Sequence, residues 1–202
     1  MFQSHSRLRS LILEYSSEIE EVAFVFDRMA LGEKVDAVNS LRGSRVFQAL
    51  WDKAADSTAV AIEDIVPVSL KPMEPVVFHC RGSQRGLPPF NIICCRPPVV
   101  AGEAMLWGYS ETYVRAVIGP GYYTVHNSLV SPHGSIALDY TMVPPEAPPD
   151  WPRVRPNSVG LGKYVFDGML TYLRRVACDV WVAANTKNDR ETGSYYAMVR
   201  LL

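Results

Sequence analysis

Between residues 59 and 143 the chain contains seven short runs rich in β-branched and aromatic residues: AVAIEDIVPV (59–68), PVVFHC (75–80), FNIICC (90–95), AMLWGY (104–109), YVRAVI (113–118), GYYTVHN (121–127) and SIALDYTMV (135–143). Proline and glycine clusters separate several of them, and Ile118-Gly119-Pro120-Gly121 has the composition of a tight turn. Short runs of this kind, divided by turn residues, predict the strands of an antiparallel meander.

The alternation within these runs predicts a strongly curved sheet. Neighbouring side chains of a strand point to opposite faces, so Trp107 and Tyr109 share one face while Leu106 takes the other. Both faces are apolar, so the sheet should be covered on both sides. An antiparallel sheet or partial barrel of about 8–9 strands with helices packed on it meets that requirement.

Helices are expected over the amino-terminal segment, residues 1–56. From 7 to 30, apolar residues recur at steps of three and four, which predicts one amphipathic helix with glutamates on its outer face. Shorter helices are expected over 33–41 and over 45–55, the second with Ser44 as its N-cap. An acidic outer face argues against a helix that lies on lipid.

A proline-rich strap is expected after the meander. Residues 143–158, VPPEAPPDWPRVRPNS, hold too many prolines for a helix or an inner strand, so they should run extended over the surface. Trp151, in the middle of the segment, is the expected anchor that presses the strap onto the fold. The other interpretation is a recognition segment for a partner protein.

The remaining chain is expected to form a late helix and two closing strands. Val165, Met169 and Leu173 recur at four-residue steps, which predicts a helix over 160–177. The strands are expected at 180–185 and 195–202, with a hairpin loop at 187–193 between them. The antiparallel β-rich body would therefore span 57–202, and the chain 1–202 would be a single α+β domain.

Composition excludes several function classes. Lysine plus arginine number 20 and aspartate plus glutamate 21, a formal charge of −1, which does not indicate a nucleic-acid or membrane-surface protein. No apolar run approaches the roughly 18 residues of a membrane span. The four cysteines lack the spacing of a disulfide framework, so free thiols and the cytoplasm are expected. A homo-oligomer stays open.

The segment HCRGSQRGLPPFNIICCR (79–96) is the richest in reactive and charged side chains. A histidine beside a cysteine could form a nucleophilic pair, but His79 and Cys80 point to opposite faces of a strand. The cysteines lack the ligand spacing of a zinc site, so no metal is expected. Arg81, Arg85 and Arg96 could converge at one end of a hairpin, where forked guanidinium groups suit a carboxylate or a phosphate.

The absence of a catalytic motif favours a ligand-binding barrel without catalysis or cofactor, for a small or lipid-like molecule. Its apolar body would contact the aromatic side chains, and its anionic end would meet an arginine. The expected ligand-binding residues are Arg81, Arg96, Trp107, Tyr109 and Tyr122. One alternative is a protein-interaction module that docks through the N-terminal helices or the strap. Another is an enzyme that uses His79, Asp139 or a cysteine.

Overall fold

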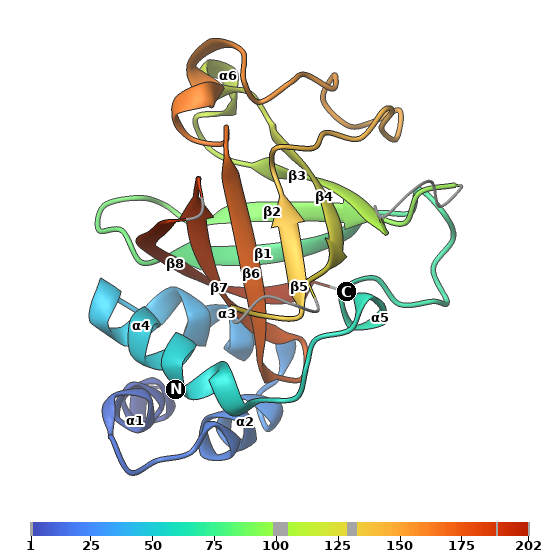
Figure 1. The fold of residues 1–202 in the computed structure, drawn as a ribbon. Helices are drawn as coiled ribbons and strands as arrows, with labels where there is room; N and C mark the ends of the chain where they lie inside the picture. Colours follow the sequence, from blue (N-terminus) through green and yellow to red (C-terminus); the bar gives the residue numbers. More distant parts are fainter. Residues whose placement is uncertain (1, 99–104, 129–132, 189, 202) are drawn as a thin grey trace.

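A computed structural model describes residues 2–98, 105–128, 133–188 and 190–201, with the side chains of 2–5 left out. Eight antiparallel strands form a closed barrel in chain order, with β8 pairing back onto β1 (Figure 1). The predicted α+β fold, with helices on a strongly curved antiparallel sheet, is confirmed. The strands are β1 (Val76–Gly82), β2 (Phe90–Cys95), β3 (Leu106–Glu111), β4 (Gly121–Asn127), β5 (Ile136–Asp139), β6 (Met169–Ala177), β7 (Val180–Lys187) and β8 (Arg190–Leu201).

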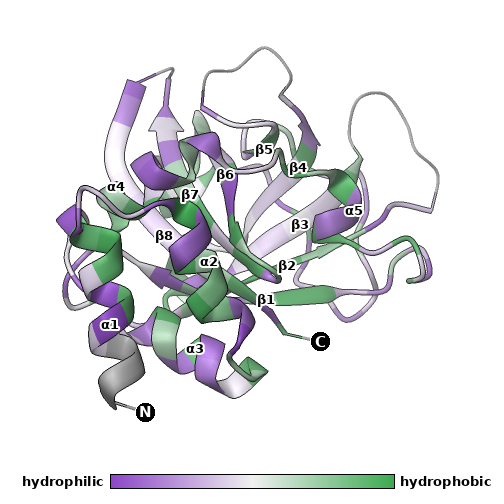
Figure 2. Ribbon diagram, turned by 90° about the horizontal axis from the view of Figure 1, so that it is seen from below, coloured by the Kyte–Doolittle hydropathy of each residue, from purple (hydrophilic) through white to green (hydrophobic). Residues whose placement is uncertain are grey.

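Four helices pack on the outer face of the barrel. They contact mainly β6, β7 and β8, with α3 also against β1. Seen from below, α1, α2 and α3 lie in front of the barrel and carry both hydrophilic and hydrophobic stretches (Figure 2). No helix within the described ranges is long and apolar enough to cross a bilayer. The helical elements are α1 (Phe2–Leu13), α2 (Ile19–Asp27), α3 (Leu31–Ser40), α4 (Ser44–Lys53), η1 (Ala54–Asp56), α5 (Ile62–Ile65), α6 (Arg115–Ile118) and η2 (Gly160–Tyr164).

Bulky side chains occupy the interior of the barrel. Phe78 meets Trp181 edge-on at 5.6 Å between ring centroids, and Tyr123 lies 5.1 Å from Tyr140. The ring of Tyr123 passes so close to Gly108 that a Cβ there would lie 2.3 Å from it. The interior-facing side chains therefore form a hydrophobic core of their own.

A second core joins the helices to the outer face of the barrel. Phe26 of α2 and Phe47 of α4 are fully buried, in one cluster with Val182 of β7 and Val199 of β8. Strands β7 and β8 thus bury both faces, one against the barrel interior and one against helices. This is the arrangement that their apolar residues on both faces predicted.

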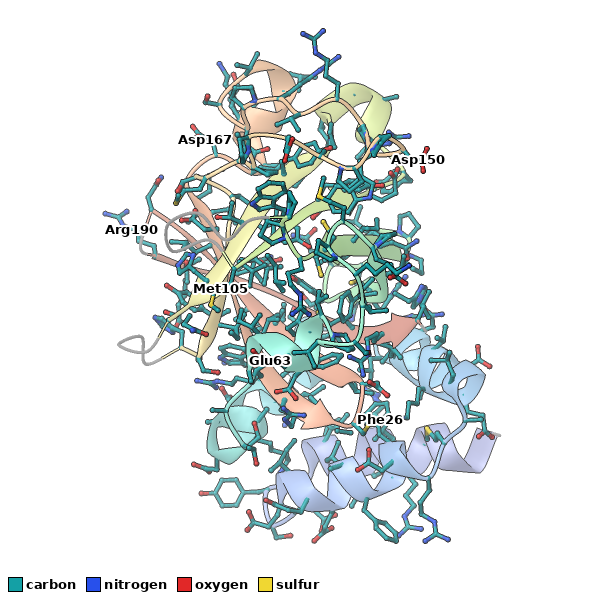
Figure 3. The ribbon with its side chains drawn as sticks, turned by 90° about the vertical axis from the view of Figure 1, so that its right-hand side faces the viewer. Phe26, Glu63, Met105, Asp150, Asp167 and Arg190 are labelled. Carbon is teal, nitrogen blue, oxygen red and sulfur yellow. The ribbon has the colours of Figure 1, made fainter. Side chains whose placement is uncertain are left out.

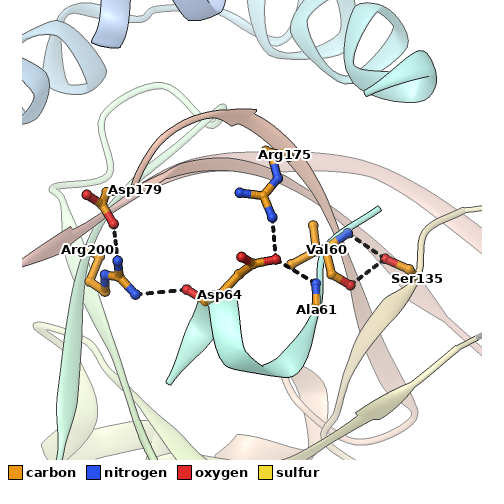
Figure 4. A network of polar contacts seen from close by, with 7 residues as sticks. All are labelled: Val60, Ala61, Asp64, Ser135, Arg175, Asp179 and Arg200. Carbon is orange, nitrogen blue, oxygen red and sulfur yellow. Dashed lines mark hydrogen bonds and ion pairs between the residues drawn. The ribbon is translucent and has the colours of Figure 1, made fainter. Parts of the chain in front are cut away.

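Hydrogen bonds and ion pairs hold the single-turn helix α5 across one end of the barrel (Figure 4). The Asp64 carboxylate caps the Ala61 N–H at 2.7 Å and pairs with Arg175 of β6. Arg200 of β8 donates to the Asp64 carbonyl oxygen at 2.9 Å and pairs with Asp179. These contacts explain why the interior-facing residues near one end of β6 and β8 are arginines.

The predicted helix over 7–30 is two helices. Helix α1 ends at Leu13 and α2 begins at Ile19. The Ser17 hydroxyl donates to the carbonyl oxygens of Leu11 and Glu14, and Lys53 of α4 donates to those of Glu14 (2.8 Å) and Ser17 (2.5 Å). Side chains thus satisfy the carbonyls left free by the break, and the chain turns without a glycine or proline.

The predicted late helix over 160–177 is wrong. Residues 160–164 form the short η2, and Met169–Ala177 is strand β6, between β5 and β7. A spacing of four residues fits one face of a helix, but it also fits one face of a strand, because four is a multiple of two. Residues 169–177 form a strand because β5 pairs with them on one side and β7 on the other.

Two predicted strands are helical turns instead. Within 59–68 the chain forms α5, and within 113–118 it forms α6, which ends at Gly119 with φ 81°. The predicted turn at 118–121 does use a glycine at positive φ. The predicted loop at 187–193 is shorter, because β7 runs to Lys187 and β8 begins at Arg190.

Candidate functional site

Two Arg-Gly-Ser turns approach each other outside the barrel. Arg42-Gly43-Ser44 leads into α4, and Gly43 adopts φ 83°, which glycine allows at little cost. Arg81-Gly82-Ser83 ends β1. There the Ser83 backbone N–H donates to the Tyr195 carbonyl oxygen at 2.8 Å, and its hydroxyl accepts the Tyr195 N–H at 3.1 Å. Strand β8 thereby fixes the second turn.

A hollow of about 420 Å³ lies between these turns and α1, and we call it the arginine hollow. Arginines line it, and no aspartate or glutamate does. Among the described residues, none of these four arginines forms an ion pair with a carboxylate. Positive charge is therefore concentrated here without a local counter-charge. The four arginines are Arg9, Arg42, Arg45 and Arg85.

Neighbouring groups respond to this charge. Burial, and then the nearby charge of Arg42, lower the pKa of Arg81, whose guanidinium donates to the Leu87 carbonyl oxygen at 2.9 Å. Burial, and then Arg81, lower the pKa of His79. The imidazole of His79 is thus kept neutral at neutral pH, and its Nε2 lies 2.8 Å from the Asn39 side-chain oxygen.

The amino terminus of α4 adds donors to the arginine hollow. No side chain caps this ten-residue helix, and Gly43, Ser44 and Arg45 line the hollow. The first N–H groups of a helix carry partial positive charge and suit an anion. Guanidinium forks, a serine hydroxyl and a helix amino terminus are the donor types that bind a phosphate or carboxylate group.

The predicted convergence of Arg81, Arg85 and Arg96 is only partly present. Arg81 and Arg85 belong to the β1–β2 hairpin end, whereas Arg96 follows β2 at the opposite end. There Arg96 donates to the carbonyl oxygens of Val66 (2.9 Å) and Pro67 (2.7 Å), so it holds the chain after α5. The turn and the open end of an antiparallel hairpin lie a strand length apart, so side chains at the turn cannot contact side chains at the open end.

The three predicted ligand-binding aromatics do not belong to the interior cluster, and Trp107 is the strand partner of Cys95, next to Arg96. Trp107, Tyr109 and Tyr122 are buried, and Tyr109 and Tyr122 form a cluster with Ile93 under the strap. Tyr109 lies 4.9 Å from the Trp151 ring, and the Tyr122 hydroxyl donates to the Pro152 carbonyl oxygen. Burial, and then Tyr109, raise the pKa of Tyr122. That these rings contact a ligand stays a prediction.

The candidate catalytic groups are not brought together. His79 contacts α3, whereas the Asp139 carboxylate on β5 accepts from the Thr141 N–H (2.8 Å) and hydroxyl (2.6 Å). Cys80 and Cys94 face the barrel interior, where burial raises the pKa of both thiols. In the described part of the chain, no three His, Cys, Asp or Glu side chains cluster as metal ligands would.

The sequence pointed to only one side of the arginine hollow. Arg85 was named as an anion-binding candidate, but Arg9, Arg42 and Arg45 were not, because they belong to distant helices. The available signal was the recurrence of Arg-Gly-Ser at 42–44 and 81–83. Repetition of a tripeptide does not show that its two copies meet.

Comparison of the chain with protein-family models, with curated proteins and with solved structures finds no match.

Proposed function

We propose that this protein binds a small anionic molecule in the arginine hollow and that it does so without catalysis. The main observation that supports this proposal is that four arginines and no carboxylate line the hollow. Like charges held around one concavity repel each other, and an anion that enters removes this repulsion. Binding of the anion therefore also raises the free energy of unfolding of the chain.

The size and lining of the hollow indicate the ligand class. About 420 Å³ exceeds what one phosphate fills, and it falls in the range of small-molecule sites. Leu13 and Val46 supply apolar surface beside the arginines. A phosphate or carboxylate group attached to a small organic body satisfies both parts, with the charged group at α4 and the body against the two apolar side chains.

The closed barrel is the scaffold of this site. Its interior is occupied by aromatic and aliphatic side chains, so the proposed ligand lies outside, between the hairpin end of β1–β2 and the helices. Strand β8 fixes one turn, and the core shared with the helices fixes the other. We also propose the cytoplasm as its compartment, which four free thiols support.

Titration calorimetry tests the proposal with phenyl phosphate, benzoate and inorganic phosphate as probes. We expect saturable binding of phenyl phosphate that weakens as salt increases, because exposed charges are screened. Replacing Arg45 and Arg85 by glutamine should weaken binding by about tenfold or more, equivalent to about 1.4 kcal/mol. The probe set also separates phosphate from carboxylate recognition.

The matched control is the double substitution Arg28→Gln with Arg190→Gln, which removes two exposed arginines outside the hollow. It should leave the affinity for phenyl phosphate within about twofold of the original, since screened charges far from the site contribute little. Equal affinity in R45Q/R85Q and wild type, or no saturable binding of any probe, would refute the proposed site.

A further inference from the structure

Helices α6 and η2 lie at the end of the barrel opposite α5 (Figure 1), and exposed apolar side chains gather on and beside them. Helices α6 and η2 contact each other there. Val117 is 63% exposed, Val159 65% and Tyr164 71%, and Leu161 and Val165 are exposed as well. We call residues 113–118 and 159–165 the tip. Clustered apolar groups at a protein surface mark a contact site, whereas single ones are common.

The backbone of the tip is anchored, so these side chains are held outward. Phe166 is buried, and its ring stacks on that of Tyr140 at 5.6 Å, as a plug in this end of the barrel. The N–H groups of Val165 and Phe166 both donate to the Gly162 carbonyl oxygen, at 2.9 and 2.8 Å. Gly162 lies so close to Ile118 that a Cβ would come within 2.6 Å of its carbonyl oxygen.

Positive charge accompanies the apolar side chains. A hollow of about 500 Å³ at the tip is lined by Arg115, Arg153 and Arg155 together with apolar residues, and no carboxylate lines it. Arg115 pairs with Glu111 at 2.7 Å, whereas Arg153 and Arg155 form no ion pair with any described residue. Lys163 is also exposed, and its Nζ lies 5.0 Å from the Tyr164 ring centroid.

Among the carboxylates of this end, Glu111 pairs with Arg115, whereas two others stand aside from the hollow. Asp150 and Asp167 point toward opposite sides of the molecule in Figure 3, and neither lines the hollow. The chain as a whole is almost neutral, with a formal charge of −1, yet Arg153 and Arg155 lie together at this hollow, which no carboxylate lines. The tip thus combines protruding aliphatic groups, an interfacial tyrosine and cations.

We propose that the tip docks this protein onto an anionic lipid surface. The aliphatic side chains enter the boundary between headgroups and acyl chains, and Arg153, Arg155 and Lys163 meet lipid phosphates or carboxylates. Both contributions are needed, because shallow insertion and attraction to a charged leaflet each bind weakly alone. The tip and the arginine hollow share no lining residue, so this inference is independent of the proposed ligand.

The geometry favours lipid over a polypeptide partner. Every strand of the barrel pairs on both sides, so a peptide finds no free edge onto which to add a strand. Helices α6 and η2 lie beyond the strand ends (Figure 1), and Val117, Val159 and Tyr164 are more than half exposed there, open to a surface that the tip contacts. Lysine and tyrosine side by side suit the interface, where stems lie in apolar surroundings and polar ends in water.

Vesicle flotation tests the proposal with the full chain. One vesicle set contains phosphatidylcholine alone, and the other contains phosphatidylcholine mixed with phosphatidylserine. We expect the chain to float with the mixed vesicles, to stay behind with the neutral ones, and to detach as salt rises. V159S/L161S and R153Q/R155Q should each lower the partition coefficient onto mixed vesicles by about tenfold or more.

Matched controls separate a specific tip from general stickiness. Phe24→Ser removes an exposed apolar side chain of α2, and R7Q/R28Q removes two exposed arginines away from the tip. Because Arg190 pairs with Lys187, which donates to the Lys163 and Tyr164 carbonyl oxygens, R7Q/R28Q replaces R28Q/R190Q as the charge control. It and Phe24→Ser should float like the original chain, and circular dichroism should show that every variant is folded. Wild type that ignores mixed vesicles, or tip variants that float as well as it does, would overturn the proposal. Binding of polyglutamate through the tip without any flotation would overturn it in favour of an acidic polypeptide.

Discussion

At the scale of single residues, the face of a strand decides what a side chain can do. His79 and Cys80 are neighbours, but His79 contacts Asn39 of α3 while Cys80 lies in the barrel core. Burial raises the pKa of Cys80 and Cys94, and it raises that of Cys95 to about 12. A thiol reacts as its thiolate, so these three are protected both by access and by protonation.

Thiol alkylation tests whether the three buried cysteines are protected. In the native chain at pH 8, iodoacetamide should modify Cys178 alone, since it is the exposed one of the four. It should react more slowly than a free thiol, because burial and then Asp179 raise its pKa. Its rate should rise with pH through that raised pKa. In denaturant without reductant, mass spectrometry should count four alkylations, as expected for four free thiols. Native labelling of Cys80 or Cys94 at the rate of Cys178 would contradict the buried placement.

At the scale of elements, the proline-rich strap (143–158) shields an aromatic face that the barrel turns outward. Trp151 packs between the rings of Tyr109 and Tyr122, at 4.9 and 6.5 Å. Near the strap's end, the Asn157 amide donates to the carbonyl oxygens of Tyr122 and Tyr140, each at 2.6 Å. The strap is thus held at an apolar anchor, Trp151, which the sequence predicted, and at a polar one, Asn157, which it did not.

Trp151→Ala should lower the free energy of unfolding by about 1 to 3 kcal/mol, below the range for a fully buried tryptophan because this side chain is half-buried. Trp151→Phe, the control, keeps most of the ring contact and should cost less than half as much. Urea unfolding followed by circular dichroism measures both. Equal midpoints for Trp151→Ala and wild type would show a loose strap and would favour a partner-recognition segment.

At the scale of the whole molecule, the helices and the barrel share one core. Phe26 of α2 is fully buried in the cluster that contains Val182 and Val199 of the barrel, and Figure 3 shows its place among the helices. The Lys34 ammonium group donates to the Cys178 carbonyl oxygen at 2.8 Å, and the Cys178 N–H donates to the Asp27 carboxylate at 2.8 Å. We therefore expect helices and barrel to unfold together, as one domain would.

Phe26→Ala should cost about 3 to 5 kcal/mol, as for other buried phenylalanines. The loss of stability should appear in the unfolding of the barrel as well as in that of the helices. Far-ultraviolet dichroism, which follows the helices, and tryptophan fluorescence, to which Trp107 and Trp181 of the barrel contribute, should give one coincident transition at a lower denaturant concentration. Two separate transitions, with only the dichroism shifted, would show that residues 1–56 unfold independently of the barrel.

The sequence by itself determined the fold class, the region of the helices, most strands and the irregular course of the strap. These depend on local patterns: alternation for strands, steps of three and four for α2 to α4, and proline for extended chain. The apolar pattern gave the wrong prediction where it fits both a helix and a strand. At 169–177 the four-residue spacing suits either structure, and pairing with β5 and β7 makes the segment a strand.

Only the tertiary structure decided where the functional surfaces lie. Arg42 and Arg45 reach Arg85 because α4 packs beside the hairpin end of β1, and Arg115 reaches Arg155 because α6 and η2 fold over one end of the barrel. A net charge of −1 concealed both groupings. The physical reason is that a charged or binding surface depends on distances between residues far apart in the chain, and local periodicity carries no information about those distances.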